Sequence, residues 1–407
     1  MKKDTPSEEN HRVLGGSNEN GPMNYVTRVF DHPQAIDASA WDGLLATQDA
    51  PSPFMQHAYL CAMHSSASAV AETGWQAQFV TLWQEQTLVA ACPFYVKSHS
   101  YGEYVFDWAW ANAYEQHGLR YYPKGLCAVP FTPVPGSRLL AIHASARLAL
   151  VQALLRVCQQ HQLSSLHVLL PSEADRAACA EAGLMARQSV QFHWRNEGFA
   201  SFEAFLASLS QDKRKKIKQE RRRVHEAGVR FETRTGREID STDWDFFYAC
   251  YERTYLEHGN APYLTRDFFA AMQADMPANW VLFVAEREGR RIACSLIAVQ
   301  DLGLPSASAY GRYWGALERV DCLHFEACYY QPLQWCIAHG VQRFEGGAQG
   351  EHKMARALMP VPTHSAHWLA HPAFADAVDR FLEREREGVN AYMDHLASRS
   401  PFSAQFK

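Results

Sequence analysis

The sequence lacks the segments and motifs that mark several large classes of protein. No window of the 407-residue chain approaches the roughly 18 apolar residues of a membrane-spanning helix, and its first 24 residues hold no apolar run typical of a secretory signal. The motifs GxGxxG, GxxxxGK[ST], GxSxG and HExxH are also missing. These absences argue against a dinucleotide, Walker-type, α/β-hydrolase or zincin site.

Cysteine pairs with metal-binding or redox spacing are missing as well. The ten cysteines are scattered singly from Cys61 to Cys336, and no CxxC occurs. In a chain of this length that pattern predicts buried, reduced thiols. We therefore expect a cytoplasmic protein, and no cysteine has a sequence context that suggests a nucleophile.

One group of histidines has the spacing of a metal site. His364, His367 and His371 would share a helix face, where they could ligate a metal ion. Neighbouring prolines instead favour a strand, on which His364 and His367 would point to opposite faces. We therefore expect no metal site.

What the sequence does contain is ample apolar surface. It is 47% hydrophobic and 12% aromatic, which excludes a disordered, collagen-like or coiled-coil chain. At roughly 150 residues per domain, the length predicts two or three globular units. The formal net charge of −5 gives no global signature of a nucleic-acid-binding protein.

Two segments of similar pattern indicate an internal duplication. Each half is expected to contain a hairpin, an aromatic strand, a helix and a second strand, in that order. The expected elements cover 76–98, 101–118, 144–161 and 166–170 in the first half, and 279–301, 307–315, 323–339 and 341–345 in the second.

A strongly basic helical segment, residues 201–228, is expected between the halves. From Lys213 to Arg223 there are eight basic residues and one acid, although the chain as a whole is net acidic. Such a run is either a solvated helix face or an electropositive rim for a phosphate-bearing ligand, such as a nucleotide sugar, coenzyme A or tRNA. We favour the rim because so little acid compensates these cations. RNA binding by this helix alone is a further interpretation.

Polar groups also sit among aromatic residues in two clusters. Residues 107–140 are unusually rich in Trp, Tyr and Pro, and form either an ordered loop packed on the core or the wall of a binding cleft. In HFEACYYQPLQWC, residues 324–336, His324 and Glu326 lie at the entry to a helix. There Glu326 either complements the helix dipole or serves with His324 as an acid or base.

The third cluster, FEGGAQGEHKMARALMP over residues 344–360, is the most suggestive. A strand runs into Gly346, Gly347 and Gly350, and ionisable residues follow at once. Glycines after a strand allow close backbone approach and free amide donors, which suits an anion or a developing oxyanion. A simple turn would explain the glycines but not the ionisable residues, so we favour a site.

Several blocks resemble the FemAB-like branch of the GNAT superfamily, in the subfamily described as N-acyltransferases or peptidoglycan-biosynthesis-like proteins. They cover residues 54–385 and read WAWANAY, YYPK, PFTPV, QFHWRN, KRKKIKQERRRVHEAGV, GRYW, HFEACYYQ and GAQGEHK. The resemblance implies an α/β fold of two tandem GNAT-like domains, each a mixed sheet flanked by helices, joined by a basic helical segment. It also implies transfer of an acyl or aminoacyl group to an amine.

The domain organisation follows from the duplication and the resemblance together. We expect a flexible leader over residues 1–24, an N-terminal GNAT-like domain over 25–200, a basic helical linker over 201–230 and a C-terminal GNAT-like domain over 231–407. In better-understood relatives the donor is aminoacyl-tRNA and the acceptor is a cell-wall precursor. The motifs of this subfamily depart from theirs, so acyl-CoA and aminoacyl-tRNA both stay open as co-substrates.

Direct acyl transfer requires a neutral amine, a stabilised oxyanion and two substrates held in attack geometry, but no enzyme nucleophile. Glu351 or His352 is the expected base, with Glu326 and His324 as alternatives. Lys353 is expected at the oxyanion or a phosphate. The other expected substrate-binding residues are Arg312, Tyr313, Trp314, Tyr329, Tyr330, Gln331, Gln349, Tyr122, Lys124, Trp110 and Tyr114. The residues expected to attract phosphates are Lys213, Arg214, Lys215 and Lys216.

The expected acceptor is a small-molecule or peptidyl amine, for example a cell-wall-precursor-like molecule. A different class of function uses the same cleft without chemistry: a binding module that recognises a glycan or peptide, since a fold alone does not establish an activity.

Overall fold

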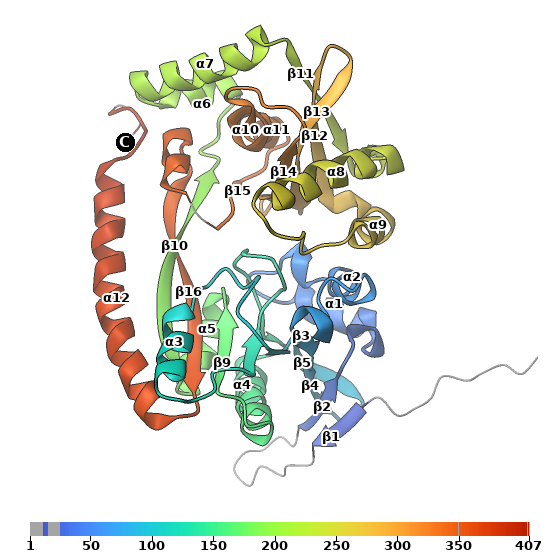
Figure 1. Cartoon of the computed structure of the whole chain (residues 1–407), viewed down its shortest axis with the longest axis vertical. Coiled ribbons are helices and arrows are strands. Elements are labelled where there is room, and N and C mark those ends of the chain that lie inside the picture. Colours follow the sequence, from blue (N-terminus) through green and yellow to red (C-terminus); the bar gives the residue numbers. More distant parts are fainter. Residues whose placement is uncertain (1–10, 15–24, 349, 405, 407) are drawn as a thin grey trace, which may run out of the picture. The chain divides into compact units, whose positions relative to one another are not determined.

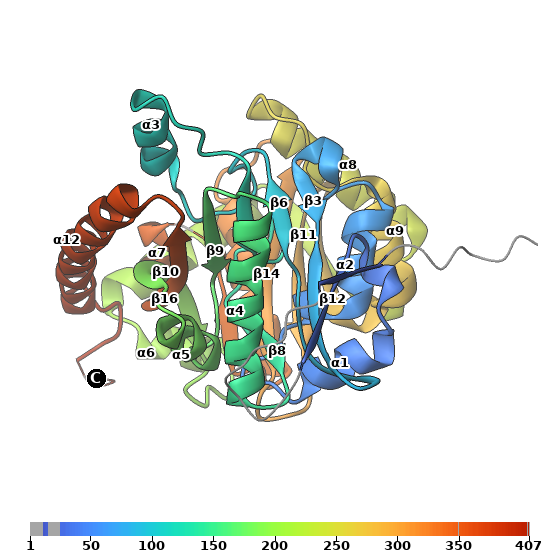
Figure 2. The same cartoon turned by 90° about the horizontal axis from the view of Figure 1, so that it is seen from below.

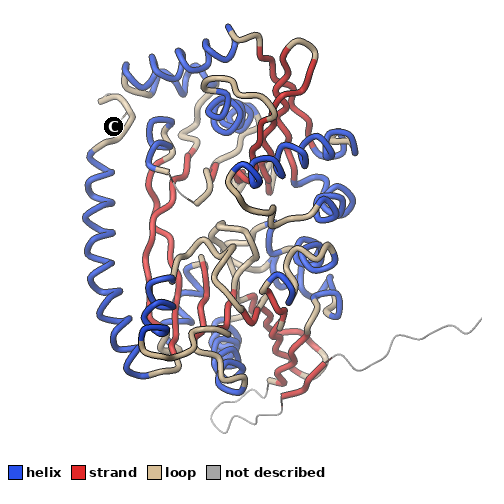
Figure 3. Tube along the Cα trace, in the orientation of Figure 1, coloured by secondary structure: helices blue, strands red, loops and turns tan. Residues whose placement is uncertain are grey.

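The computed structural model describes residues 11–14, 25–348, 350–404 and 406. Helices and strands alternate in two compact units, drawn in Figures 1 and 3. One unit comprises Met1–Gln188 and His364–Glu387, and the other Ser189–Thr363 and Gly388–Lys407. The elements that pass from one unit to the other are strand β10 (Met185–Arg195), strand β16 (Met359–Leu369) and helix α12 (Pro372–Ser398).

The first unit holds an antiparallel sheet of order β1-β2-β4-β5-β8. Its strands are β1 (His11–Leu14), β2 (Val26–Phe30), β4 (Phe79–Gln84), β5 (Thr87–Cys92) and β8 (Leu140–Ala141). The hairpin expected over 76–98 is confirmed by β4 and β5. Strand β1 lies in the segment expected to be a flexible leader, so that expectation is wrong for His11–Leu14. Residues 1–10 and 15–24 lie outside the described residues.

A second set of strands in the first unit runs in the order β16-β9-β7-β6-β3. The new strands are β3 (Trp75–Ala77), β6 (Tyr95–Lys97), β7 (Lys124–Cys127) and β9 (Ser165–Leu169). Strands β7 and β9 are parallel, and the expected helix α4 (Ala144–Gln160) connects them. Figure 2 shows α4 lying along the strands, and its buried residues Leu150, Leu154 and Val157 join the core there.

The aromatic stretch over 101–118 does not form the expected strand. Trp108–Gln116 is helix α3, and the strand of this half is β7 instead. The sequence WAWANAYEQ contains good helix formers, and Trp110 and Tyr114, four residues apart, share a buried face that packs with Tyr121. Helical spacing therefore decided the structure, whereas aromatic content had suggested a strand. The other helices of this unit are α1 (Ala38–Ala46), α2 (His57–Ser65) and α5 (Glu173–Glu181).

The strands of the second unit run in the order β11-β12-β13-β14-β15-β10. Its further strands are β11 (Val229–Thr235), β12 (Trp280–Arg287), β13 (Arg290–Gln300), β14 (Ser308–Ala316) and β15 (Arg343–Glu345). Strands β14 and β15 are parallel, like β7 and β9. The expected order of hairpin, aromatic strand, helix and strand is confirmed in this half. A parallel pair joined by a helix occurs in both units, which supports the duplication.

The helix that connects β14 and β15 is interrupted by a π-helical turn. It consists of α10 (Leu323–Phe325), the π-turn Glu326–Tyr330 and α11 (Gln331–Ala338). Single π-turns inside α-helices are frequent at functional sites. The remaining helices α8 (Ser241–Glu257) and α9 (Arg266–Asp275) also belong to this unit.

The basic segment forms two helices of the second unit, α6 (Phe202–Ser208) and α7 (Gln211–Glu226). Phe205, Leu206, Leu209 and Ile217 anchor them in the main core of that unit. The cations of α7 consequently project from a helix that is fixed on one side by apolar packing. Across the described part of the chain, no helix is both long and apolar enough to cross a lipid bilayer.

Candidate active site

Strands β14 and β15 part from each other at the candidate active site. They pair only where Ser308–Tyr310 faces Arg343–Glu345. Beyond Tyr310, β14 continues along β13, whereas the chain after β15 turns at Gly346 and Gly347. Parting strands expose backbone amide and carbonyl groups that a sheet would otherwise satisfy, and such groups can bind a ligand.

A β-bulge in β14 shapes the same opening. Leu296 of β13 faces Tyr313, but the next residue, Ile297, faces Gly311, so that Arg312 is the extra residue. Bulges re-aim side chains and are common beside active sites. The Arg312 guanidinium lies 4.9 Å from the centre of the Tyr313 ring and donates a hydrogen bond to its hydroxyl at 3.0 Å.

A pocket of about 170 Å³ lies in this opening. It brings together several residues from the list of expected site residues, and with them the glycines at the end of β15. These lining residues are Arg312, Tyr313, Trp314, His324, Tyr329, Gly346 and Gly347. The residues come from three elements far apart in sequence, namely β14, the interrupted helix and the turn after β15.

Lys353 closes one side of the glycine turn. The side chain is 4% exposed, and its Nζ donates a hydrogen bond of 3.1 Å to the carbonyl oxygen of Gly347. Burial lowers the pKa of Lys353 to about 8, with Cys328 acting weakly in the opposite direction. Gly346 is required here because an added Cβ would overlap Leu358 and lie 3.3 Å from Cδ of Lys353. The turn therefore presents a buried cation beside the pocket.

His352 lies next to the pocket through Tyr329. Its Nε2 is 3.2 Å from the hydroxyl of Tyr329, which itself lines the pocket. Desolvation, followed by the charges of Lys353 and Arg356, lowers the pKa of His352. The imidazole is therefore neutral at neutral pH, the form that can accept a proton.

Glu351 occupies a different environment from its neighbour. Its carboxylate is paired with Arg399, just beyond α12, and accepts a hydrogen bond from the Tyr392 hydroxyl at 3.4 Å. The residue is exposed, and its carboxylate contacts Arg399 and Tyr392 and does not line the pocket. Of the two expected bases, the geometry favours His352.

The two alternative bases separate in space. His324 lines the pocket and contacts Trp314 edge-on at 5.4 Å between ring centres, and desolvation followed by the charge of His352 lowers its pKa to about 4. Glu326 is buried, and both of its oxygens accept hydrogen bonds from Nε of Arg221 on α7, at 3.1 and 3.2 Å. Gln331 also donates to Glu326, at 2.8 Å.

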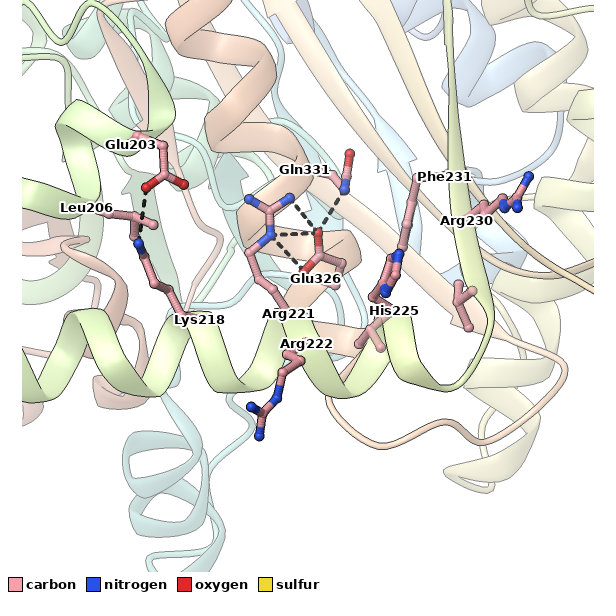
Figure 4. A pocket seen from close by; sticks show the side chains of 12 residues that line it. Glu203, Leu206, Lys218, Arg221, Arg222, His225, Arg230, Phe231, Glu326 and Gln331 are labelled. Atoms are coloured by element: carbon pink, nitrogen blue, oxygen red, sulfur yellow. Dashed lines mark hydrogen bonds and ion pairs between the residues drawn. The ribbon is translucent and has the colours of Figure 1, made fainter.

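Glu326 and Gln331 line a second, larger hollow of about 620 Å³, which runs along α7 (Figure 4). Neither residue lines the smaller pocket in the strand opening. The paired and buried carboxylate of Glu326 links α7 to the π-turn.

A second link between α7 and the π-turn was missed by sequence reasoning. The hydroxyl of Tyr330 donates to Glu220, and Nη2 of Arg356 donates to the same carboxylate at 2.9 Å. The Arg356 guanidinium also lies 3.7 Å from the centre of the Phe325 ring. Tyr330 is thus fully buried in an ionic network and does not line the pocket, contrary to expectation. The sequence did contain one signal for this link, because Glu220 is the single acid in the basic run from Lys213 to Arg223.

The expected site residues of the N-terminal half form a buried network in the first unit. Lys124 is fully buried, donates to Ser100 at 2.7 Å and to Glu103 at 2.8 Å, and is also paired with Asp107. The hydroxyl of Tyr122 is 2.8 Å from Oγ of Ser100. The ammonium group of Lys124 therefore has its hydrogen-bond and charge partners within the first unit.

The aromatic residues Trp110 and Tyr114 pack in the core of the first unit. His367, one of the histidines considered for metal binding, is buried on strand β16, with its Nδ1 2.7 Å from Nδ1 of His167. The strand predicted for the segment that contains His364 and His367 is confirmed by β16. Among the described residues there is no group of three side chains that could hold a metal ion.

Two sets of expected residues remain outside these pockets. Lys213, Arg214, Lys215 and Lys216 lie near the N-terminus of α7, where Lys215 and Lys216 are exposed, and none of the four lines either hollow. Gln349 lies outside the described residues.

The strand opening, the mixed sheets and their repetition define a tandem GNAT-like α/β protein, as the sequence predicted. A family model for FemAB-like proteins, described as peptidoglycan biosynthesis/recognition, matches residues 32–404, so the chain belongs to the FemAB-like family.

Solved structures share the fold at low sequence identity. FemX matches with a TM-score of 0.52 and 10% identity, over 84% of this chain and 98% of FemX. The C-terminal domain of a putative lysylphosphatidylglycerol synthetase from Agrobacterium fabrum matches with a TM-score of 0.53 and 11% identity, over 86% and 96%. L-PGS from Bacillus licheniformis matches with a TM-score of 0.51 and 9% identity, over 85% and 97%. No curated protein matches the sequence.

Proposed function

We propose that this protein is an N-acyltransferase that moves an acyl or aminoacyl group from an activated donor to an amine acceptor. The observation that carries the proposal is the pocket between parting strands, with the Lys353 ammonium and the neutral His352 on its border. Membership of the FemAB-like family supports a role in the chemistry of the cell wall. A cell-wall-precursor-like amine is therefore the acceptor class we propose.

The reaction needs only groups that the second unit provides. The acceptor nitrogen forms the new amide bond to the acyl carbon, and its proton passes to His352. The donor's thiolate or alkoxide leaves with the electron pair of the broken bond and takes up that proton. Lys353 and the amides after β15 would stabilise the oxyanion of the tetrahedral intermediate. A buried ammonium is effective there because it is already oriented in a site of low polarity.

The donor in this proposal is acyl-CoA or aminoacyl-tRNA, both of which carry phosphates. Lys213, Arg214, Lys215 and Lys216 on α7 would attract either molecule by long-range electrostatics. All ten cysteines are free thiols, which supports a reducing compartment and hence the cytoplasm as the place of the reaction.

The test is a search for product mass after incubation of the protein with acyl-CoA or charged tRNA and candidate amines. His352→Ala should abolish turnover and leave the Tm nearly unchanged, because the side chain is exposed. Glu351→Gln should retain part of the activity. His395→Ala, another exposed histidine of the same unit, is the matched control and should retain full activity.

A second candidate function is recognition without chemistry, which the family's description also includes. Binding of a glycan or peptide, with no product from either donor, would favour it and exclude the transferase. Full turnover by the His352→Ala variant would instead remove His352 from the mechanism.

A further inference from the structure

The side chain of Lys353 ends in an amine at the border of the smaller pocket, the hollow of about 170 Å³ between the parting strands. The residue is 4% exposed, and its Nζ donates a hydrogen bond of 3.1 Å to the carbonyl oxygen of Gly347, which lines that pocket. A lysine amine without its proton is a nucleophile, and burial is one way in which proteins favour that form. The chemistry of this amine therefore extends beyond the stabilisation of an oxyanion.

The pocket wall beside this amine is made of glycines. A Cβ atom on Gly347 would lie 3.9 Å from Nζ of Lys353 and 4.0 Å from the carbonyl oxygen of Gly311, and both glycines line the pocket. Gly346, which also lines it, would place a Cβ atom 3.3 Å from Cδ of the same lysine. Glycines have no side chain that would screen the amine, so a small molecule in the pocket can approach Nζ.

The groups around Lys353 do little to keep it charged. The titratable and charged residues near it are His193 on β10, His324 and Cys328 on the interrupted helix, and His352 and Arg356 on the turn that carries the lysine. Desolvation lowers the pKa of all three histidines, that of His193 to about 3 and that of His324 to about 4. In the described part of the chain no carboxylate is paired with Lys353, so a carbonyl dipole alone stabilises the ammonium.

The amine of Lys353 is consequently uncharged to an unusual degree near neutral pH. Burial lowers its pKa to about 8, so about half of the molecules carry a neutral amine at pH 8. An ordinary lysine, with a pKa near 10.4, is neutral in less than about 1% of molecules at that pH. The reactive fraction of Lys353 therefore exceeds that of an ordinary lysine by about two orders of magnitude.

We propose that Lys353 is a site of self-acylation, which a small acyl thioester modifies when it enters the pocket and no acceptor amine is present. The lone pair of Nζ forms an amide bond to the acyl carbon, and the bond between that carbon and sulfur breaks. The thiolate leaves with the electron pair of the broken bond and takes up the proton that the nitrogen loses. The inference rests on the proposed function in one respect, since both place the acyl carbon in this pocket.

Self-acylation would limit the protein's own activity. An acyl group on Nζ removes the charge of Lys353, and with it the group that we propose to stabilise the oxyanion. Because the product is an amide, the acyl group stays on the lysine. The modified protein should lose turnover by at least about a hundredfold, as expected for the loss of an oxyanion donor. An acceptor amine in the pocket would intercept the acyl group first and so protect the lysine.

Peptide mapping by mass spectrometry tests the proposal. The full-length protein is incubated at pH 8 with S-acetyl-N-acetylcysteamine, a thioester without phosphates, and with no acceptor. Lys353 should be acetylated at least about tenfold faster than Lys215, which is exposed on α7. In urea the two lysines should react at similar rates, because unfolding removes the burial that distinguishes them. Equal rates in the folded protein, or an unmodified Lys353, would overturn the proposal.

Lys97 is the matched internal control for burial. It is fully buried, and desolvation lowers its pKa to about 7, but its Nζ lies 3.5 Å from the centre of the Trp75 ring. Because the ring covers this amine, Lys97 should react at least about tenfold more slowly than Lys353. Equal rates at the two lysines would show that burial alone produces the reactivity, and the role assigned to the pocket would be wrong. Lys353→Arg, which keeps the charge, should remove the fast phase of acetylation and leave the slow one.

The same samples separate this inference from the proposed function. Acetylation of Lys353 without any amide product from candidate amines would support self-acylation and leave the transferase unsupported. Amide product together with an unmodified Lys353 would support the transferase and overturn self-acylation. Where both reactions occur, addition of the accepted amine should slow the acetylation of Lys353, because the two amines compete for one acyl group.

Discussion

The ammonium of Lys353 is buried against the carbonyl oxygen of Gly347, 3.1 Å from it, and no carboxylate is paired with it in the described part of the chain. A carbonyl dipole compensates a full charge only in part. The site therefore holds a cation that the folded protein stabilises poorly and that an incoming anion would stabilise well. This relationship connects the stability of the protein with its proposed chemistry.

The first prediction concerns stability and pH. The pKa of Lys353 is lowered from 10.5 to about 8, so between these pH values the unfolded chain binds a proton that the folded protein does not. The free energy of unfolding of the wild type should therefore rise with pH over this window, relative to Lys353→Met, by up to about 3 kcal/mol. Urea unfolding of both proteins at pH 7.5 and pH 10 measures the difference. Parallel changes in the two proteins would show that the lysine is not desolvated.

The second prediction concerns the pH dependence of turnover. Because the pKa of His352 is lowered, the imidazole loses its proton below the usual value of 6.5. The rate of turnover should rise with pH below 6.5 and then become constant, and we call this rise the acidic limb of the pH–rate profile. His352→Gln should remove the acidic limb together with most of the activity. Tyr329→Phe, which deletes the 3.2 Å contact between the Tyr329 hydroxyl and His352, should shift the pH of the acidic limb and keep measurable turnover. A limb that persists in His352→Gln would assign the base to another group.

The third prediction uses glycines in two environments. Gly346→Ala should lower the free energy of unfolding by about 1–3 kcal/mol, because the new methyl group overlaps Leu358 and crowds Lys353. It should also reduce turnover, since the turn that presents Lys353 must shift. Gly43→Ala is the control: this position on α1 has open space, and alanine should raise the stability by about 1 kcal/mol. Thermal unfolding of both variants checks the opposite signs.

The fourth prediction concerns the buried pair of Arg356 and Glu220, which are 3% and 8% exposed in their side chains. Arg356→Met should destabilise the protein by about 3–5 kcal/mol, because it leaves the buried carboxylate with only the hydroxyl of Tyr330. Adding Glu220→Gln should recover part of this loss, so that the double variant is more stable than the sum of the single effects. Chemical denaturation of the four proteins completes the cycle, and strict additivity would show that the residues do not interact.

Much of the fold was predictable because periodicity is a local property. The hairpins, helix α4 and strand β14 were expected from alternation and helical spacing alone. Helix α3 was missed because aromatic content was given more weight than the four-residue spacing of Trp110 and Tyr114. The sequence did not predict that β10, β16 and α12 each begin in one unit and end in the other. Contacts between segments that are distant in the chain leave no local sequence pattern.

The candidate site was predictable only in part for the same reason. Local clustering around the glycines indicated Lys353 and His352, and the structure brings both to the border of the pocket. Sequence could not show that Glu351 pairs with Arg399 or that Glu326 pairs with Arg221, because both partners lie far away along the chain. The same tertiary pairing turned Tyr330 and Lys124 from expected ligand contacts into buried structural groups.

The π-turn Glu326–Tyr330 confines the effect of a change in chain length to the pocket. The turn contains one residue more than an α-helix would use, and it takes up that residue as a local bulge. Loss of a single residue here would restore regular α-helical winding and leave the helical residues on both sides facing as they do now. Leu333 and Trp335 would stay in the core, whereas the side chains of the turn, Tyr329 among them, would change direction at the pocket. A descendant of this chain can therefore lose the π-turn and keep the fold, but it cannot do so without reshaping the pocket.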